Sequence, residues 1–115
     1  MITLFLLKFF IIFTNCSELF NEQPLSVSRG YLSSASLPNQ GITMFGGGKN
    51  DIQVHDTIDI YNINNNLWST SKLSIPRQNL AASSLSYPPK IFFAGGCDFH
   101  CVLHFDIIDI YEYNL

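Results

Sequence analysis

After residue 20 the chain alternates short apolar runs with clusters of turn-forming residues, and no stretch keeps a helical period. Residues 57–63 alternate between Ile and other residue types, which is the period of two that predicts a strand with unlike faces. Residues 33–37 are small and apolar, and 42–45 form an apolar run that ends in glycines. Three asparagines at 64–66 predict a turn before a further strand at 67–73. The pattern predicts an all-β fold of short antiparallel strands.

The pattern occurs twice along the chain. Ile-Asp-Ile-Tyr stands at 58–61 and again at 108–111, while Arg29 and Arg77 and the two glycine runs recur at a spacing of 48. The spacing grows from 48 to 50 between the glycines and the second Ile-Asp-Ile-Tyr, so the intervening loop has two extra residues in the second copy. Four strands in roughly 50 residues are typical of one blade of a β-propeller.

These copies resemble the kelch repeat, whose unit has an apolar run, a Gly-Gly pair, a spaced Tyr, a later Trp and an Arg that opens the next unit. The first copy has all of them in order, and the second ends before its Trp and its fourth strand. The matching residues are Gly47, Gly48, Tyr61, Trp68, Arg77, Gly95, Gly96 and Tyr111. The resemblance implies about two consecutive four-stranded antiparallel blades of a kelch-type β-propeller. It implies structural roles for these residues, with Arg77 hydrogen-bonded to carbonyls across a blade boundary.

The predicted organisation has four parts, which are a signal peptide (1–16), a linker (17–27), a first repeat (28–76) and an incomplete second repeat (77–115). A propeller needs roughly four to eight blades to close, and apolar side chains on an uncovered blade face remain in contact with water, which loses their stabilising burial. We therefore expect a fragment of a larger propeller, or a chain that associates with itself to cover its open faces. A gene remnant that does not fold by itself is the third alternative.

The first 13 residues are almost wholly apolar, but they are too few for the roughly 20 that span a bilayer. Their length is typical of a secretory signal peptide that is cleaved after Cys16. Lys8 lies within the apolar run and no basic residue precedes it, so an uncleaved membrane anchor is the alternative. We expect a secreted protein or one of the secretory pathway, with a membrane-anchored protein as the alternative.

Charge argues against nucleic acid as a partner. Only 13% of residues are charged, the formal net charge is −3, and the six Lys and Arg residues are scattered without a basic run. Nothing in the sequence therefore attracts a phosphate backbone.

Two loops carry the candidate chemistry. The segment 97–104 holds Cys97, His100, Cys101 and His104 within eight residues. Four ligands in one octapeptide would strain a tetrahedral zinc site, so we predict neither a metal nor another cofactor. A disulfide between Cys97 and Cys101, which secretion would permit, and two free thiols remain as alternatives.

The first copy has the segment 49–56 in the same place, where only His55 could correspond to His104. Loops between propeller strands vary freely and carry function. The candidate binding residues are Asp51, His55, Asp98, His100 and His104. Asp59 and Asp109 recur among apolar neighbours, so we interpret them as one solvated or turn-bonding carboxylate per blade and not as an acid–base pair.

No catalytic set is present, so the sequence predicts a protein-binding scaffold without catalytic activity of its own. The alternative is part of a propeller enzyme, of the copper oxidase or sugar-processing type, whose active site lies in further blades. The expected partner is a protein that the sequence does not identify.

Overall fold

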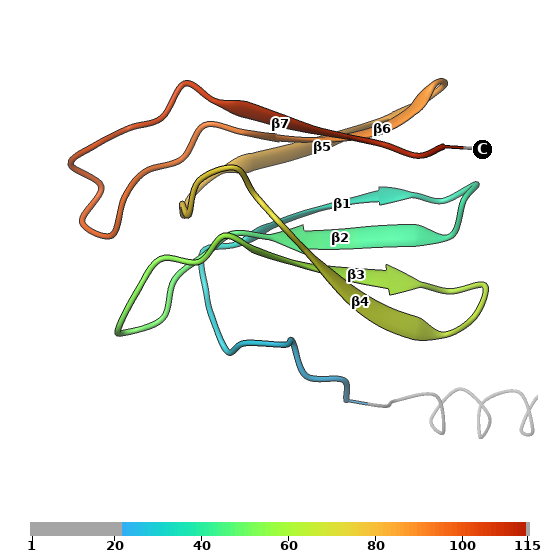
Figure 1. Ribbon diagram of the computed structural model, residues 1–115, viewed down its shortest axis with the longest axis horizontal. Helices are drawn as coiled ribbons and strands as arrows, with labels where there is room; N and C mark the ends of the chain where they lie inside the picture. The colour runs from blue at the N-terminus through green and yellow to red at the C-terminus, as the bar shows by residue number, and fades with distance from the viewer. Residues whose placement is uncertain (1–21, 115) are drawn as a thin grey trace, which may run out of the picture.

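The computed structural model describes residues 22–114. The predicted signal peptide at 1–16 and residues 17–21 of the predicted linker lie outside the described residues. Within 22–114 the chain forms seven strands and no helix (Figure 1). The prediction of an all-β chain is therefore confirmed.

The strands form two antiparallel sheets that follow one another along the chain. In each sheet every strand pairs with its neighbour in the sequence, in the orders β1-β2-β3-β4 and β5-β6-β7. The strands are β1 (Ser33–Leu37), β2 (Ile42–Gly46), β3 (Thr57–Asn62), β4 (Leu67–Lys72), β5 (Ala81–Ser86), β6 (Pro89–Ala94) and β7 (Ile108–Glu112). Within the described residues the two sheets do not close into a ring, so the structure shows an antiparallel sheet of four strands beside one of three.

The asparagine run forms the hairpin turn between β3 and β4, because its side chains cap their own backbone. Asn62 Oδ1 accepts the N–H of Asn64, and Asn65 Oδ1 accepts the N–H of Leu67. Asn66 adopts a positive φ of 56° and accepts a hydrogen bond from the Tyr61 hydroxyl at 2.6 Å. The turn and the paired strands are thus fixed by neighbouring residues of the sequence.

Gly47 and Gly48 follow β2 with φ values of 71° and 98°, a region that side chains disfavour. A Cβ at Gly47 would lie 2.6 Å from the Arg77 carbonyl oxygen, and one at Gly48 would lie 2.4 Å from that of Gly30. Gly95 and Gly96 repeat the φ values, at 68° and 96°. All four positions favour glycine for its conformation, and Gly47, Gly48 and Gly96 also require it because another backbone approaches closely.

The repeat is visible in the backbone hydrogen bonds. Gly30 and Lys49 exchange two backbone hydrogen bonds, and Gln78 and Cys97 exchange the same pair 48 residues later. The correspondence reaches back to Ser26 and Ser74, whose N–H groups both donate to the aspartate of the Ile-Asp-Ile-Tyr run. By the same spacing Leu25 and Leu32 correspond to Leu73 and Leu80.

The core lies between the two sheets, where β1 packs against β5 and β6. It consists of Leu37, Ile42, Ile58, Leu73, Leu80, Ile91 and Phe93. Gly46 admits the Phe93 ring, since a Cβ there would lie 2.8 Å from Phe93 Cε1. Leu73 and Leu80, from the connection between the sheets, complete the buried cluster and link the two repeats.

Candidate functional site

The candidate site is the end of the molecule where the β2–β3 and β6–β7 loops lie (Figure 1). Both loops are closed at their start by the same kind of hydrogen bond, because Asn50 Oδ1 and Asp98 Oδ1 each accept two backbone N–H groups of the residues that follow. The Asn50 N–H donates to the Gln53 carbonyl, and the Asp98 N–H donates to that of Leu103. Two residues lie between Asn50 and Gln53, and four lie between Asp98 and Leu103, so the extra residues of the second copy lie within 99–102.

Backbone pairing corrects the expected match between the histidines of the two loops. The N–H of His55 donates to the Gly48 carbonyl, and the N–H of Phe105 donates to the Gly96 carbonyl in the second repeat. His55 therefore corresponds to Phe105, and His104 corresponds to Val54. The two histidines differ by one position in register, because residue type alone does not determine which backbone groups are paired.

The structure separates the five candidate binding residues by accessibility. Asp51, His100 and His104 are exposed. His55 is buried at 6% exposure, so its side chain is not available to a partner. Asp98 is half-buried and organises the turn through its carboxylate. Three of the five candidates thus remain at the loop surface.

The sequence analysis missed the most exposed apolar side chains of this end. Ile52 at the tip of the first loop is 86% exposed, and Val102 and Leu103 of the second are 81% and 58% exposed. The signal was present in the sequence as apolar residues within polar loops, which a folded chain would otherwise bury. These side chains give both loops an apolar tip.

Cys97 and Cys101 form a disulfide in the structure. Cys97 is buried beneath the loop, whereas Cys101 belongs to the segment with the two extra residues. The Asn79 side-chain amide lies within hydrogen-bonding reach of both sulfur atoms, at 3.8 and 3.4 Å. The cross-link therefore fixes the longer loop to the strand-like pairing below it.

Lys49 connects the two loops. Its Nζ lies 4.7 Å from the centre of the Phe99 ring and donates a hydrogen bond to the Phe99 carbonyl oxygen at 3.4 Å. The same ammonium lies 5.5 Å from the centre of the Tyr31 ring, a distance typical of a cation–π contact. These contacts hold the two loops against each other.

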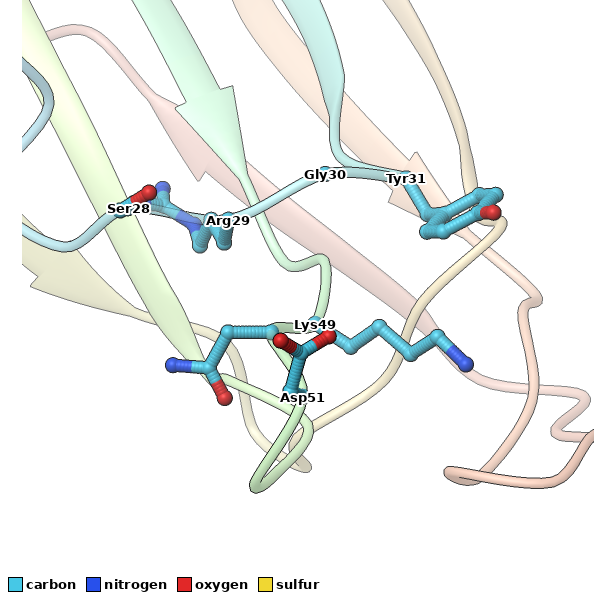
Figure 2. A pocket seen from close by; sticks show the side chains of 7 residues that line it. Ser28, Arg29, Gly30, Tyr31, Lys49 and Asp51 are labelled. Atoms are coloured by element: carbon cyan, nitrogen blue, oxygen red, sulfur yellow. The ribbon is translucent and has the colours of Figure 1, made fainter.

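Lys49 also borders an open pocket of about 300 Å³ (Figure 2). The pocket is lined by Ser28, Arg29, Gly30, Tyr31, Lys49, Asn50 and Asp51. Figure 2 shows the Lys49 side chain extended beneath Tyr31, while Arg29 lies on the other side of Gly30. The Arg29 side chain is bound to backbone carbonyls and to Asp59, so it is not free to hold a ligand.

The recurring aspartates are ion-pair partners of the recurring arginines. Arg29 donates to Asp59 Oδ2 at 2.8 Å, and Arg77 donates to Asp109 Oδ2 at 2.9 Å. The Asp59 side chain is 3% exposed and that of Asp109 is 16% exposed. The expectation of a solvated carboxylate is thus wrong for Asp59, because the arginine and Ser26 supply the hydrogen bonds that burial requires.

Both carboxylates have pKa values below the ordinary value of an aspartate. Burial alone would raise the pKa of Asp59, but hydrogen bonds from Ser26 and Arg29 outweigh it and hold that pKa below the ordinary value. The pKa of Asp109 is lowered in the same way, with burial opposed by hydrogen bonds from Ser74 and Arg77. Burial, reinforced by the charge of Asp109, raises the pKa of Tyr111.

Each arginine side chain also donates to backbone carbonyls of the sheet that holds its aspartate, and Arg77 donates to one carbonyl before the predicted start of its repeat. Arg29 also donates to the carbonyls of Phe45 and Gly47, and Arg77 donates to those of Phe93 and Ile75. The two repeats are joined through the backbone of Arg77, whose carbonyl accepts the N–H of Gly48. The pairs are structural, since a charged and fully hydrogen-bonded carboxylate is not set up to exchange protons near neutral pH.

Metal ligands do not gather in the described part of the chain. Residues 22–114 contain no group of three or more His, Cys, Asp or Glu side chains placed to hold an ion. The same residues contain no helix with the length and hydropathy that a membrane crossing needs.

The chain has no match among the protein-family models or among the curated protein sequences with which it was compared.

Proposed function

We propose that the chain is a kelch-type propeller segment that acts as a protein-binding scaffold, within a larger secreted or membrane-associated protein. The kelch resemblance of the two repeats supports the propeller part. The observation that carries the binding part is the pair of apolar loop tips, Ile52 and Val102, on loops whose backbones are fixed.

A protein partner fits this surface better than a small molecule does. The tips are exposed to solvent. The neighbouring pocket is open, and its arginine, Arg29, is already bound to Asp59. A contiguous exposed apolar patch marks a protein or membrane contact, and we infer that the two tips together form such a patch. Binding to an anionic membrane surface draws on clustered basic residues, whereas these loops hold Lys49 beside Asp51, Asp98 and Asp106.

The test is partner capture with the full chain as bait and quantitative mass spectrometry as the readout. We expect a double variant, Ile52→Asp with Val102→Asp, to lose the proteins that the wild-type chain captures. The matched control is Ile63→Asp, since Ile63 is 65% exposed but lies in the β3–β4 turn at the other end of the strands.

A second variant tests the polar rim, with Asp51, His100 and His104 all changed to Ala. It should reduce capture without changing the identity of the captured proteins, because polar rim contacts contribute less than apolar anchors. If both loop variants capture the same proteins as the wild type and the control, the loops are not the binding surface.

A further inference from the structure

The interface between the two sheets joins two different surfaces. The first sheet contributes the face that carries Leu37, Ile42 and Ile58, since these positions share one side in the strand register. The second sheet contributes the face that carries Ile91 and Phe93, and the equivalent face of the first sheet is the one that points away from this interface. We call the first surface the socket face, which consists of Leu37, Met44, Ile58, Ile60 and, in the second sheet, their equivalents 48 or 50 residues later. We call the second surface the plug face, which consists of Phe93, Ile91, Ala82, Tyr111 and, in the first sheet, their equivalents 48 or 50 residues earlier.

The second sheet has a socket face of its own, which the described residues 22–114 leave uncovered. Ile108 is 59% exposed, although the equivalent Ile58 is fully buried. Leu85 is 44% exposed, whereas the equivalent Leu37 is 2% exposed. Ile110 is 54% exposed and occupies the place of Ile60, which packs against the core.

Within the part of the chain that the structure describes, the plug face of the first sheet is open as well. Phe45 and Tyr61 occupy the places of Phe93 and Tyr111, and Phe45 is half-buried where Phe93 is fully buried. Trp68 extends this face, with its ring 5.0 Å from Tyr61 and 6.1 Å from Phe45. Leu25 and Leu32 flank it and are also half-buried, while the equivalent Leu73 and Leu80 are in the core.

We propose that copies of this chain associate head to tail, with the open socket face of one copy on the open plug face of the next. The occupant is a second copy because the chain already contains this contact once, between its own two sheets. Such a contact is heterologous, so each added copy leaves a socket at one end and a plug at the other. The inference concerns the chain of the printed sequence by itself, and it does not depend on the proposed loop contacts because neither open face includes the loop tips.

The intermolecular contact is weaker than the internal one. Ala94 stands where Gly46 admits Phe93, so its methyl group meets the incoming Phe45 ring. Lys90 replaces Ile42 and forms an ion pair with Glu112 at 2.7 Å. Association is therefore reversible and depends on concentration.

Sedimentation equilibrium of the full chain over a range of concentrations tests the proposal. We expect the average mass of the wild type to rise with concentration beyond that of a dimer. Ile110→Arg blocks the socket and Ser34→Arg blocks the plug, since Ser34 is exposed and shares a face with Phe45. Each variant should weaken association at least about tenfold, whereas Ile52→Arg in the loop tip should not.

Mixing the two variants gives the sharpest outcome. One has an intact plug and the other an intact socket, so an equimolar mixture should form dimers and nothing larger. Far-UV circular dichroism of each variant confirms that it is folded, and the dimer in the mixture shows that each retains one working face. Monomeric wild type at every concentration, or association sensitive to Ile110→Arg but not to Ser34→Arg, would overturn the proposal.

Ala94→Gly supplies a test by gain of affinity. This change copies the internal interface by giving the open socket the space that Gly46 provides. Relief of about 1 kcal/mol of overpacking corresponds to association about fivefold tighter. Unchanged or weaker association of this variant would show that Phe45 does not dock at position 94.

Discussion

Gly46→Ala tests how the two sheets meet. The new Cβ would lie 2.8 Å from Phe93 Cε1 and 3.0 Å from Cζ, closer than packed atoms approach. Phe93 is fully buried, and its ring packs edge-on against Tyr111 with centroids 6.1 Å apart, so a shift of the ring would disturb that packing. Overpacking of this kind destabilises a core by about 1–3 kcal/mol.

Part of that loss is offset in the unfolded chain. Replacing Gly by Ala reduces the conformational freedom of the unfolded state, which stabilises the fold by about 0.4–1 kcal/mol. We therefore expect Gly46→Ala to lower the free energy of unfolding by about 1–2 kcal/mol. For a chain of this size that is a fall in Tm of about 5–10 °C.

The assay is urea unfolding followed by the fluorescence of Trp68, the only tryptophan of the chain. Dilute protein keeps association out of the measurement. Gly30→Ala is the matched control, since a Cβ there would meet nothing within 4 Å and its φ is not positive. If Gly46→Ala is as stable as Gly30→Ala, the Phe93 ring does not rest on Gly46 and the sheets pack differently.

Two further predictions concern the arginine–aspartate pairs. Arg29→Met should destabilise the chain by about 3–5 kcal/mol, because it leaves Asp59 buried without its cation, and Arg77→Met should destabilise it less because Asp109 is more exposed. Urea midpoints of the two variants check this order, and equal losses would contradict it. The folded-state pKa values of both aspartates lie below their ordinary value of 3.8, so their contribution to stability is complete above about pH 5 and is lost as pH falls through the lowered values. Urea midpoints measured from pH 7 to pH 2 should therefore stay constant at first and then fall. The fall should be shallower in Asp59→Asn. An identical fall in that variant would show that Asp59 is not the group being protonated.

The strands could be predicted because local sequence determines them. Strand β1 has the predicted bounds, and β2, β3 and β4 differ by one residue at one end. The alternation of residues 57–63, the glycines with positive φ and the asparagine turn all act within a few residues of one another. Local features of this kind are visible in a sequence before any tertiary contact is known.

The ion pairs could not be predicted in the same way. Arg29 and Asp59 are 30 residues apart, and only the folding of β3 beside the segment before β1 brings them together. A signal was nevertheless present, since both members of the pair recur in the second copy as Arg77 and Asp109. Recurrence identified the residues, but not that they contact each other.

The predicted correspondence of the two histidines was wrong for a related reason. Comparison of residue types placed His55 opposite His104, although the backbone hydrogen bonds place it opposite Phe105. An insertion within a loop can be located by its anchoring hydrogen bonds, whereas the residues inside it vary freely. The match of one histidine with another was a coincidence of composition.

Identical sequence does not give identical burial in this chain. The two Ile-Asp-Ile-Tyr runs occupy the same place in their sheets, yet Ile58 is fully buried and Ile108 is 59% exposed. The difference comes from their neighbours, because the second sheet and its connection cover the first run whereas the described residues leave the second run open. Position among the repeats therefore decides whether a repeated apolar residue is buried in the core or stays exposed within the described residues. Ile58 stabilises the core, whereas its exposed counterpart Ile108 belongs to the surface for which we propose self-association.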